Sequence, residues 1–553
     1  MHVMAYVPYG ADGIVIRVEA DIRRGIPGID ITGLAEGAVR EARERVRASF
    51  RNSGFDFPTD RILINLAPAG VRKEGASLDL PIAISVMAAA GMAPVPDNLM
   101  VLGELELSGR VRPVRGVLAA VAAGLNAGIE GFIVPRENFS EAAVLANTPG
   151  MSFFAAATLA EVVHALHIKA ATGELPENGS DTLLAQDRGD DLWLGDFSEV
   201  RFQGRYKRAL EIAAAGGHNL LVFGPPGSGK TMLARRFPSI LPPLEPEEAV
   251  EVTRLHSLAG QIKAGDLSGG EPSPLRGSAG GSGGGLIRLP PFRSPHHSAS
   301  AEGILGGGRS VRPGEITMAH FGALFLDEAP EFRTPVLQSL REPLEDRVIT
   351  IVRAEGPQRL PADFQLIMAA NSCPCGRLGA RETQAKQRVY ESGCFCSTDE
   401  IRRYWRKLGG ALLDRIELRV PVCTPGVLAA GGKAEEKSAE IRRRVKAAIE
   451  IQKERFKNRG AAHEFVTRRN ARMSPAQIEK LCPLSDKAGE AFSVAAAKLG
   501  LSGRACHAIL KIARTIADLE GKDSIDTSQI LEAVQHRRFG DDPYDIFSVE
   551  ETD

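Results

Sequence analysis

Residues 219–231 read Asn219-Leu-Leu-Val-Phe-Gly224-Pro225-Pro226-Gly227-Ser228-Gly229-Lys230-Thr231. An apolar run typical of a buried strand passes into a loop with the pattern G-x-x-x-x-G-K-[ST], and helix-compatible sequence follows. Glycines let backbone N–H groups close around phosphate groups, and the start of the following helix adds partial positive charge. The stretch therefore predicts an ATP site at residues 224–231, with Lys230 on the β- and γ-phosphates and the Thr231 hydroxyl on Mg²⁺.

Two apolar strands further along the chain end in polar residues that suit the same site. Gly322-Ala-Leu-Phe-Leu is followed by Asp327 and Glu328, and Phe364-Gln-Leu-Ile-Met-Ala-Ala is followed by Asn371. We expect Asp327 to bind Mg²⁺ and Glu328 to orient and deprotonate the attacking water. Asn371 would hold that water near the γ-phosphate. The ordinary alternatives are a solvated strand edge for the acids and a strand turn for the amide.

Two arginines are candidates for contact with phosphate charge in the transition state, because a guanidinium group can bind phosphate oxygens bidentately. Arg415 follows Leu412-Leu-Asp414 at the predicted end of a helix, and Arg504 opens the predicted helix 503–519. For Arg415 the alternative is an intramolecular ion pair with Asp414.

Composition limits the class of protein. The chain has 553 residues, with 68 Lys and Arg against 69 Asp and Glu, and 43% of its residues are hydrophobic. These values predict an ordinary globular protein of several domains. No apolar run approaches the roughly 18 residues of a membrane span, and the N-terminal residues lack the pattern of a signal peptide. Seven cysteines, four of them in one segment, favour a reducing compartment. We therefore expect a cytoplasmic protein with no membrane partner.

The pattern of apolar and polar residues divides the chain into parts. Residues 1–168 alternate strand and helix patterns, residues 169–195 read as a linker, residues 196–425 predict a parallel α/β domain, and residues 426–545 are mainly helical. Expected helices include 36–50, 80–90, 399–408, 438–456, 475–481, 488–499 and 503–519. The Gly- and Ser-rich stretch 265–285 predicts a mobile loop.

The order of these motifs resembles that of AAA+ ATPases, and three further segments narrow the resemblance. Phe292-Arg-Ser-Pro-His296-His297, Arg312-Pro-Gly-Glu315-Ile and the segment 33–45 resemble the Mg-chelatase-like AAA+ ATPases of the ComM/YifB family. The resemblance implies an AAA+ P-loop core, a C-terminal helical lid, a homo-hexameric ring, Arg415 as arginine finger and Arg504 as sensor-2 arginine. It also implies a branch-migration helicase that acts on single-stranded or branched DNA in natural transformation.

A second motor function stays open, a chelatase-type motor that remodels a protein partner without DNA. The N-terminal domain weighs against it, because the resemblance implies that chelatase motor subunits lack this domain.

The N-terminal part resembles the proteolytic domain of Lon proteases, an α+β fold like domain 2 of ribosomal protein S5. Lys73-Glu-Gly75-Ala-Ser77 resembles the segment of the catalytic serine, and residues 109–120 resemble the segment of the catalytic lysine. A serine needs a nearby base to become a nucleophile. Leu118 stands at the position of the lysine, so we predict a Lon-like domain without proteolytic activity. We expect Ser77 to be a helix N-cap.

Four cysteines follow Asn371 in the spacing C-x-C…C-x-C: Cys373, Cys375, Cys394 and Cys396. Four thiolates suit tetrahedral Zn²⁺, so the pattern predicts a structural zinc site, with four reduced thiols as the alternative. His296 and His297 have no acid or cysteine at ligand spacing, and we interpret them as loop residues.

The segment 348–359 predicts a strand and a turn, and by resemblance it is the hairpin that rings of this clade extend into their pore. Arg353 and Arg359 on this hairpin, and Arg309 beside it, are the residues expected to contact DNA phosphates. Such contacts give affinity and salt dependence without sequence specificity. Thirteen Lys and Arg against six Asp and Glu in residues 433–472 are a weaker signal, with a solvated helix face as the alternative.

Overall fold

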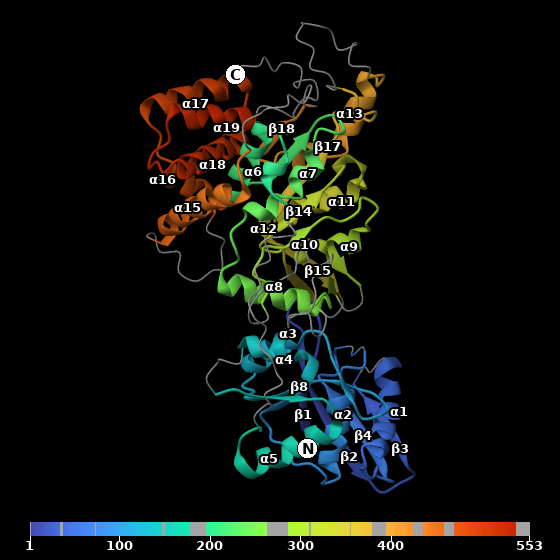
Figure 1. The fold of residues 1–553 in the computed structure, drawn as a ribbon. Helices are drawn as coiled ribbons and strands as arrows, with labels where there is room; N and C mark the ends of the chain where they lie inside the picture. Colours follow the sequence, from blue (N-terminus) through green and yellow to red (C-terminus); the bar gives the residue numbers. More distant parts are fainter. Residues whose placement is uncertain are drawn as a thin grey trace.

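The computed structural model of this protein describes residues 2–33, 37–71, 73, 75–145, 150–176, 195–262, 286–308, 311–353, 356–378, 394–423, 435–457 and 469–537. Along the chain, an N-terminal α+β part is followed by an α/β core and a set of C-terminal helices (Figure 1). This is the predicted class, with a Lon-like N-terminal domain, an AAA+ core and a helical lid. The exact domain limits stay predictions. Stretch 265–285 and Arg309 lie outside the described residues.

The N-terminal part is built on a seven-stranded mixed sheet of order β3-β4-β2-β1-β5-β8-β9. Strands β2, β1 and β4 are antiparallel, whereas β5, β8 and β9 continue from β1 in parallel. The strands are β1 (His2–Val7), β2 (Ile14–Arg23), β3 (Gly28–Thr32), β4 (Arg61–Ala67), β5 (Leu99–Val101), β8 (Gly131–Pro135) and β9 (Ser152–Ala156). A short hairpin, β6 (Glu104–Leu105) with β7 (Val111–Arg112), lies outside the sheet.

The described residues of this part form five α-helices: α1 (Gly37–Asn52), α2 (Asp79–Ala89), α3 (Val117–Asn126), α4 (Phe139–Ala142) and α5 (Leu159–Thr172). Helix α5 runs four residues into the stretch that was predicted to be a linker. The prediction that Ser77 caps a helix is wrong, because α2 begins at Asp79, the residue before it is Leu78, and no side chain caps its N-terminus. Instead Arg45 of α1 binds the buried Asp79 through Nε at 2.6 Å.

The core is a five-stranded, fully parallel sheet of order β11-β14-β17-β10-β18. Its strands are β10 (Leu220–Phe223), β11 (Phe292–Arg293), β14 (Ala323–Leu326), β17 (Gln365–Ala370) and β18 (Leu418–Pro421). The central strands are apolar without alternation, as expected of a parallel sheet that is covered on both faces. Because the strands are parallel, the residues that follow β10, β14 and β17 meet at one edge of the sheet.

Nine helices surround this sheet. They are α6 (Gly204–Gly216), α7 (Lys230–Ala234), α8 (Pro246–Leu258), α9 (Ala301–Leu305), α10 (Glu315–Met318), α11 (Thr334–Ser339), α12 (Arg341–Asp346), α13 (Thr398–Arg406) and α14 (Gly410–Leu413), as far as the chain is described. Two antiparallel hairpins extend from the core: β12 (Gly306–Gly307) with β13 (Arg312–Pro313), and β15 (Val348–Arg353) with β16 (Gly356–Pro361). The second confirms the hairpin predicted at 348–359.

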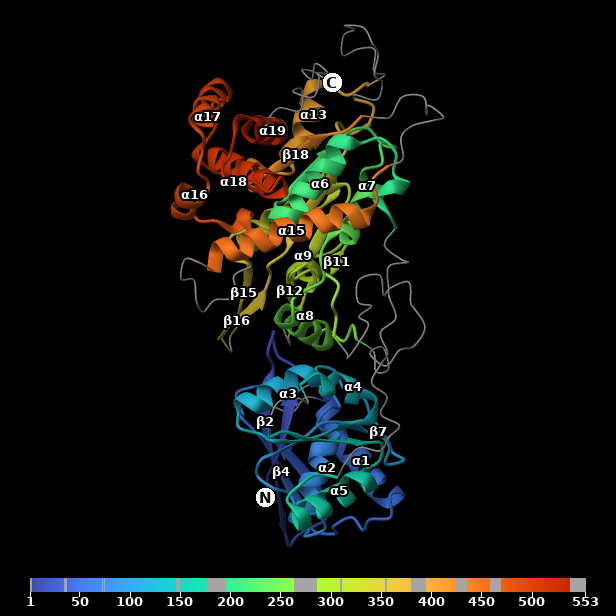
Figure 2. The ribbon, with the colours of Figure 1, turned by 60° about the vertical axis from the view of Figure 1, so that its left-hand side comes forward.

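The C-terminal helices are α15 (Ser438–Lys457), α16 (Pro475–Leu481), α17 (Asp486–Leu499), α18 (Gly503–Leu519) and α19 (Thr527–Arg537). They lie along one side of the core, where α15 and α18 pack on α6 (Figure 2). A buried ion network fixes their arrangement. Asp518 accepts hydrogen bonds from Arg514 at 3.0 Å, from Arg455 at 3.0 Å and from Asn470 at 2.7 Å.

The N-terminal part contacts the core through α3 and the turn between β1 and β2, which face α8 and the hairpin β15–β16 (Figures 1 and 2). Arg254 of α8 forms an ion pair with Asp12 of that turn, and Ser257 donates a hydrogen bond to the buried Glu141. Gly10 has a left-handed φ of +65° and lies directly against Gln358 of β16. The N-terminal part therefore touches the hairpin that was predicted to bind DNA.

Candidate active site

The loop after β10 has the backbone shape that phosphate binding requires. Gly227 and Gly229 have left-handed φ values of +78° and +83°. At Gly224 a Cβ atom would lie 2.1 Å from the carbonyl oxygen of Val422, so only glycine fits there. Helix α7 begins at Lys230, directly after this loop. The chain can therefore turn sharply at the edge of the sheet, with Pro226 and Gly227 exposed to solvent.

Lys230 is the buried cation of this loop, with 8% of its surface exposed. Its ammonium group donates hydrogen bonds to the carbonyl oxygens of Gly224 at 2.8 Å and Pro225 at 2.7 Å. Burial lowers the pKa of Lys230 to about 8, against the opposing charges of Asp327 and Glu328. Its hydrogen-bond partners among the described residues are all neutral, so its positive charge is available to an anionic ligand.

The acidic pair after β14 lies next to the phosphate-binding loop. The Thr231 hydroxyl donates to Oδ2 of Asp327 at 2.8 Å, so the two oxygens expected to bind Mg²⁺ are in contact. Glu328 follows with a left-handed φ of +51°, and its side chain is 56% exposed. Hydroxyl and carboxylate oxygens are the ligands that Mg²⁺ prefers, so the pair fits this ion. The exposed carboxylate of Glu328 is accessible to solvent water.

Asn371 joins the same group of residues from β17. Its Oδ1 accepts a hydrogen bond from the Lys230 ammonium group at 3.3 Å. The ends of β10, β14 and β17 thus bring Lys230, Asp327 and Asn371 together, although up to about 140 positions of sequence separate them. This is the arrangement expected from the three strand-end motifs.

Arg415 and Arg504 lie together, but they do not contact the phosphate-binding loop of their own chain. Arg415 is bound to Glu345 through a guanidinium nitrogen at 2.8 Å and to the carbonyl of Ala411 at 2.6 Å. Arg504 binds the other oxygen of Glu345 and lies 3.5 Å from Asp414. The expected alternative, a pair between Arg415 and Asp414, is not present in this described region, where Asp414 pairs with Arg504 and Arg537 instead.

Sequence reasoning missed two residues. Nδ1 of His297 lies 4.0 Å from a carboxylate oxygen of Glu328, so the His-His segment borders the active site. Glu345 holds both candidate arginines, and burial raises its pKa while the two guanidinium groups lower it more strongly, so that its pKa lies below the ordinary value. The histidine pair was visible as a motif. Nothing in the sequence links Glu345 of α12 with the start of α18.

The candidate DNA residues lie on the hairpin β15–β16. Arg353 and Arg359 are exposed, and Arg359 faces Thr350 across the ladder. Gly307 of the neighbouring hairpin lies beside Arg353, which confirms that the segment after His297 runs next to β15. Both arginines are therefore accessible to a ligand that approaches the hairpin β15–β16.

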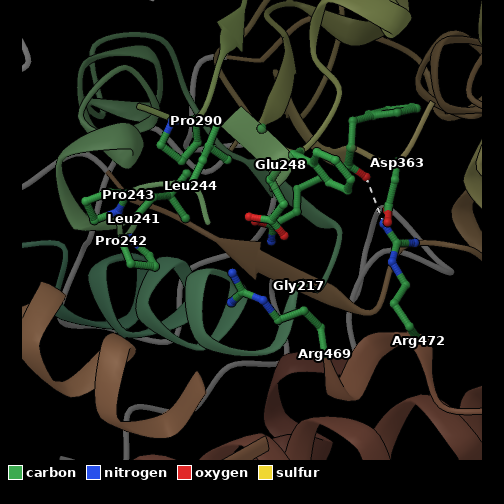
Figure 3. A pocket seen from close by; sticks show the side chains of 14 residues that line it. Gly217, Leu241, Pro242, Pro243, Leu244, Glu248, Pro290, Asp363, Arg469 and Arg472 are labelled. Atoms are coloured by element: carbon green, nitrogen blue, oxygen red, sulfur yellow. Dashed lines mark hydrogen bonds and ion pairs between the residues drawn. The ribbon is translucent and has the colours of Figure 1, made fainter. Parts of the chain in front are cut away.

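A pocket lies at the opposite, amino end of β17, where the lid meets the core (Figure 3). Arg472 donates to Asp363 at 2.6 Å and to the carbonyl of Phe364 at 3.1 Å. Arg469 donates to the carbonyl of Ala214 at 2.9 Å. Its arginines are therefore held by the protein itself, and the pocket is separate from the nucleotide site.

In the N-terminal part, Lys73 is fully buried and does not serve Ser77 as a base. Its ammonium group donates to the carbonyls of Gly33 at 2.8 Å, Leu66 at 3.1 Å and Pro68. Leu118 is also buried, and its backbone N–H donates to Glu141 at 2.8 Å. These contacts agree with a structural role, and the lack of proteolysis stays a prediction.

A P-loop, an acidic strand end and a polar strand end on a parallel sheet, with a helical lid, define an AAA+ ATPase. Three protein-family models match this chain and agree with this class. "Magnesium chelatase, subunit ChlI" matches residues 196–427, "Subunit ChlI of Mg-chelatase" matches residues 18–138, and "Magnesium chelatase, subunit ChlI C-terminal" matches residues 435–537. The chain belongs to the Mg-chelatase-like AAA+ family that includes YifB and ComM.

Some individual proteins are similar over nearly the whole chain, and another over about a third of it. The protein YifB of Salmonella typhimurium is 38% identical over 532 residues, which cover 96% of this chain and 95% of that protein. The competence protein ComM of Haemophilus influenzae is 37% identical over 542 residues, with 96% and 95% covered. A Lon protease of Chloroflexus aurantiacus is 31% identical over 198 residues, 34% of this chain and 23% of that protein.

Within the described residues, none of the helices has the length and apolar character to cross a membrane.

Proposed function

We propose that the protein hydrolyses ATP at the edge of the core sheet and uses the energy to move along DNA. The observation that carries this proposal is the meeting of Lys230, the Thr231–Asp327 pair and Asn371 around one loop. Lys230 would bind the phosphates, Glu328 would orient and deprotonate water, and Asn371 would position that water. Mg²⁺ held by Thr231 and Asp327 would screen the phosphate charge.

The arginines support a ring in which each site is completed by a neighbour. Arg415 and Arg504 share Glu345 and have no contact with their own phosphate-binding loop, so we assign both to the nucleotide of the adjacent subunit. A guanidinium group that approaches only in the transition state is worth orders of magnitude in rate. A closed ring of identical subunits is the simplest assembly that uses one such interface repeatedly, and we propose a homo-hexamer.

The DNA part of the proposal rests on the hairpin and on the relatives. Arg353 and Arg359 are exposed on β15–β16, and the N-terminal part supports this hairpin through Gly10 and Gln358. The similarity to the competence protein ComM favours single-stranded or branched DNA as the partner, and branch migration during natural transformation as the process. A cytoplasmic location follows from the same proposal.

A chelatase-type motor without DNA is the second candidate, favoured by the family descriptions. The expectation that chelatase subunits lack the N-terminal domain no longer argues against it, because "Subunit ChlI of Mg-chelatase" matches residues 18–138. The full-length similarity to ComM keeps the DNA motor as the first proposal.

The first experiment measures ATP turnover of the purified chain with and without single-stranded and branched DNA, with Lys230→Ala as the blank. We expect DNA to raise turnover several-fold and added salt to suppress the stimulation, because counterions compete for phosphate contacts. If DNA does not change ATP turnover, the proposal of a DNA translocase is refuted, and a protein partner should be sought instead.

The neighbour's role is tested by mixing two inactive variants, Lys230→Ala and Arg415→Ala. If the arginine acts on the adjacent subunit, an equal mixture in a ring restores about a quarter of the interfaces, since each needs one intact partner of each kind. If it acts within its own subunit, the mixture stays inactive. Size-exclusion chromatography with light scattering on both variants shows whether they still assemble.

A further inference from the structure

The cysteines of the segment 373–396 form a compact cluster of sulfur atoms. The Sγ atom of Cys373 lies 3.4 Å from that of Cys375 and 3.6 Å from that of Cys394, and Cys375 and Cys394 are also 3.6 Å apart. With Cys396, all four sulfurs lie within 4.8 Å of one another. A disulfide would bring two sulfurs to about 2.05 Å, so these are four separate cysteines.

The spacing of the sulfurs is that of a tetrahedral metal site. Four sulfurs that each lie about 2.3 Å from a zinc ion stand about 3.8 Å from one another. Neutral thiols are weak hydrogen-bond donors, and their mutual attraction does not explain a cluster of four. We propose that Cys373, Cys375, Cys394 and Cys396 bind one Zn²⁺ ion as thiolates, and that the ion fixes the turn after β17 against the phosphate-binding loop. Four protein ligands leave no open position, so the ion is structural.

The turn that carries the first two cysteines touches the nucleotide site directly. Gly376 closes this turn by donating its N–H to the carbonyl of Cys373 at 3.0 Å. It has a left-handed φ of +74°, and a Cβ atom there would lie 2.9 Å from Cδ of Pro226. Pro226 belongs to the phosphate-binding loop. A displacement of the turn therefore changes the packing of that loop.

Helix α13, which begins directly after the second cysteine pair, is bound to the same strand end. Its Trp405 donates a hydrogen bond to the carbonyl of Ser372 at 3.1 Å and packs edge-on against Phe223, with ring centroids 5.3 Å apart. Phe223 is the last residue of β10. Zinc would thus close a ring formed by β17, the cysteine turn and α13, next to Phe223, which precedes the phosphate-binding loop, and Pro226 within it.

The proposal has two parts that can fail separately. Metal binding by the cysteines depends only on the cluster itself. The effect on the phosphate-binding loop rests on the proposed nucleotide site. The tests therefore measure metal content and nucleotide affinity independently, and neither depends on DNA.

Metal content is measured on the full chain, purified under reducing conditions without chelator, by mass spectrometry of zinc and iron. We expect about one zinc per chain, its loss in Cys375→Ser, and full zinc content in the matched control Cys506→Ser, which lies outside the cluster. When cobalt is supplied during expression, the wild type should show the intense visible absorption of a tetrathiolate cobalt site. Cys375→Ser should not show it. Wild-type protein without metal, or with iron in place of zinc, overturns the proposal.

Nucleotide affinity is measured by titrating a fluorescent ATP analogue at saturating Mg²⁺. We expect several-fold weaker binding to zinc-free Cys375→Ser and wild-type affinity in Cys506→Ser, with circular dichroism as the check on folding. If Cys375→Ser is not folded, zinc is removed from folded wild-type protein with a chromophoric chelator and the same titration is made. Equal affinity with and without zinc overturns the positioning role, and a wild type that binds no ATP refutes the nucleotide site instead.

Discussion

Lys230 should make ATP binding sensitive to pH in a range where ATP itself hardly titrates. Its ammonium group is buried, and burial lowers its pKa to about 8. Its direct partners, the carbonyls of Gly224 and Pro225, are neutral. Phosphate oxygens bound to the ammonium group favour its charged form, so binding raises the pKa. The protonated free protein is therefore the form that binds well.

The size of the effect follows from the protonated fraction. With a pKa of about 8, roughly 90% of Lys230 is charged at pH 7 and roughly 10% at pH 9. ATP affinity should thus fall about tenfold over this range, or about 1.4 kcal/mol. Because ATP binding raises the pKa of Lys230, formation of the complex should take up close to one proton at pH 9 and almost none at pH 7.

Isothermal titration calorimetry with a non-hydrolysable ATP analogue tests both numbers, at saturating Mg²⁺ and in pairs of buffers that differ in ionisation enthalpy. The matched control is Lys230→Arg, whose guanidinium group stays charged throughout, so that its affinity, whatever its absolute value, should not change with pH. A wild-type affinity that is constant from pH 7 to pH 9, or a slope shared with the control, would refute the reasoning.

Three further predictions follow from other contacts. Glu345→Gln should lower kcat several-fold while ATP affinity stays close to wild type, because Arg415 and its partner arginine lose the carboxylate that positions them; an unchanged kcat contradicts this. Arg353→Ala with Arg359→Ala should weaken DNA binding regardless of sequence and reduce the salt slope by about 1.4 for single strands; an unchanged slope removes the hairpin from the interface. Asp518→Asn should destabilise the lid by about 3–5 kcal/mol, because two arginines lose their buried partner; thermal unfolding monitored by circular dichroism measures it.

Strand-end chemistry explains why so much of the nucleotide site was predictable. A phosphate-binding loop fixes the position of one strand end, and parallel pairing then places the ends of apolar strands at the same edge. Asp327 and Asn371 each follow such a strand, so their meeting with Lys230 required no knowledge of the loops between them. The hairpin at 348–361 was equally local, since two strand-forming runs flank a short turn.

Contacts between helices were not predictable in this way. Glu345 meets Arg415 and Arg504 only because α12, α14 and α18 come together in the fold, and charged residues on helices give no sequence signal of their partners. Ser77 shows the reverse error. Its sequence position predicted a helix cap, but α2 begins only at Asp79, two residues later. The buried carboxylate of Asp79 is bound by Arg45.

A single stretch of chain links the two sides of each proposed ATP site. It begins at Asn371, which contacts Lys230 of its own subunit, passes through the cysteine cluster and α13, and ends at Arg415, which we assign to the neighbour. The hydrogen bond from Gln338 to the carbonyl of Leu408 fixes the connection between α13 and α14. Displacements of about 1 Å at reacting groups can cost about a hundredfold in rate, so Asn371 and Arg415 both have to be held firmly in place. Zinc bound by the four cysteines would hold the turn after Asn371 against the start of α13, the helix that precedes Arg415.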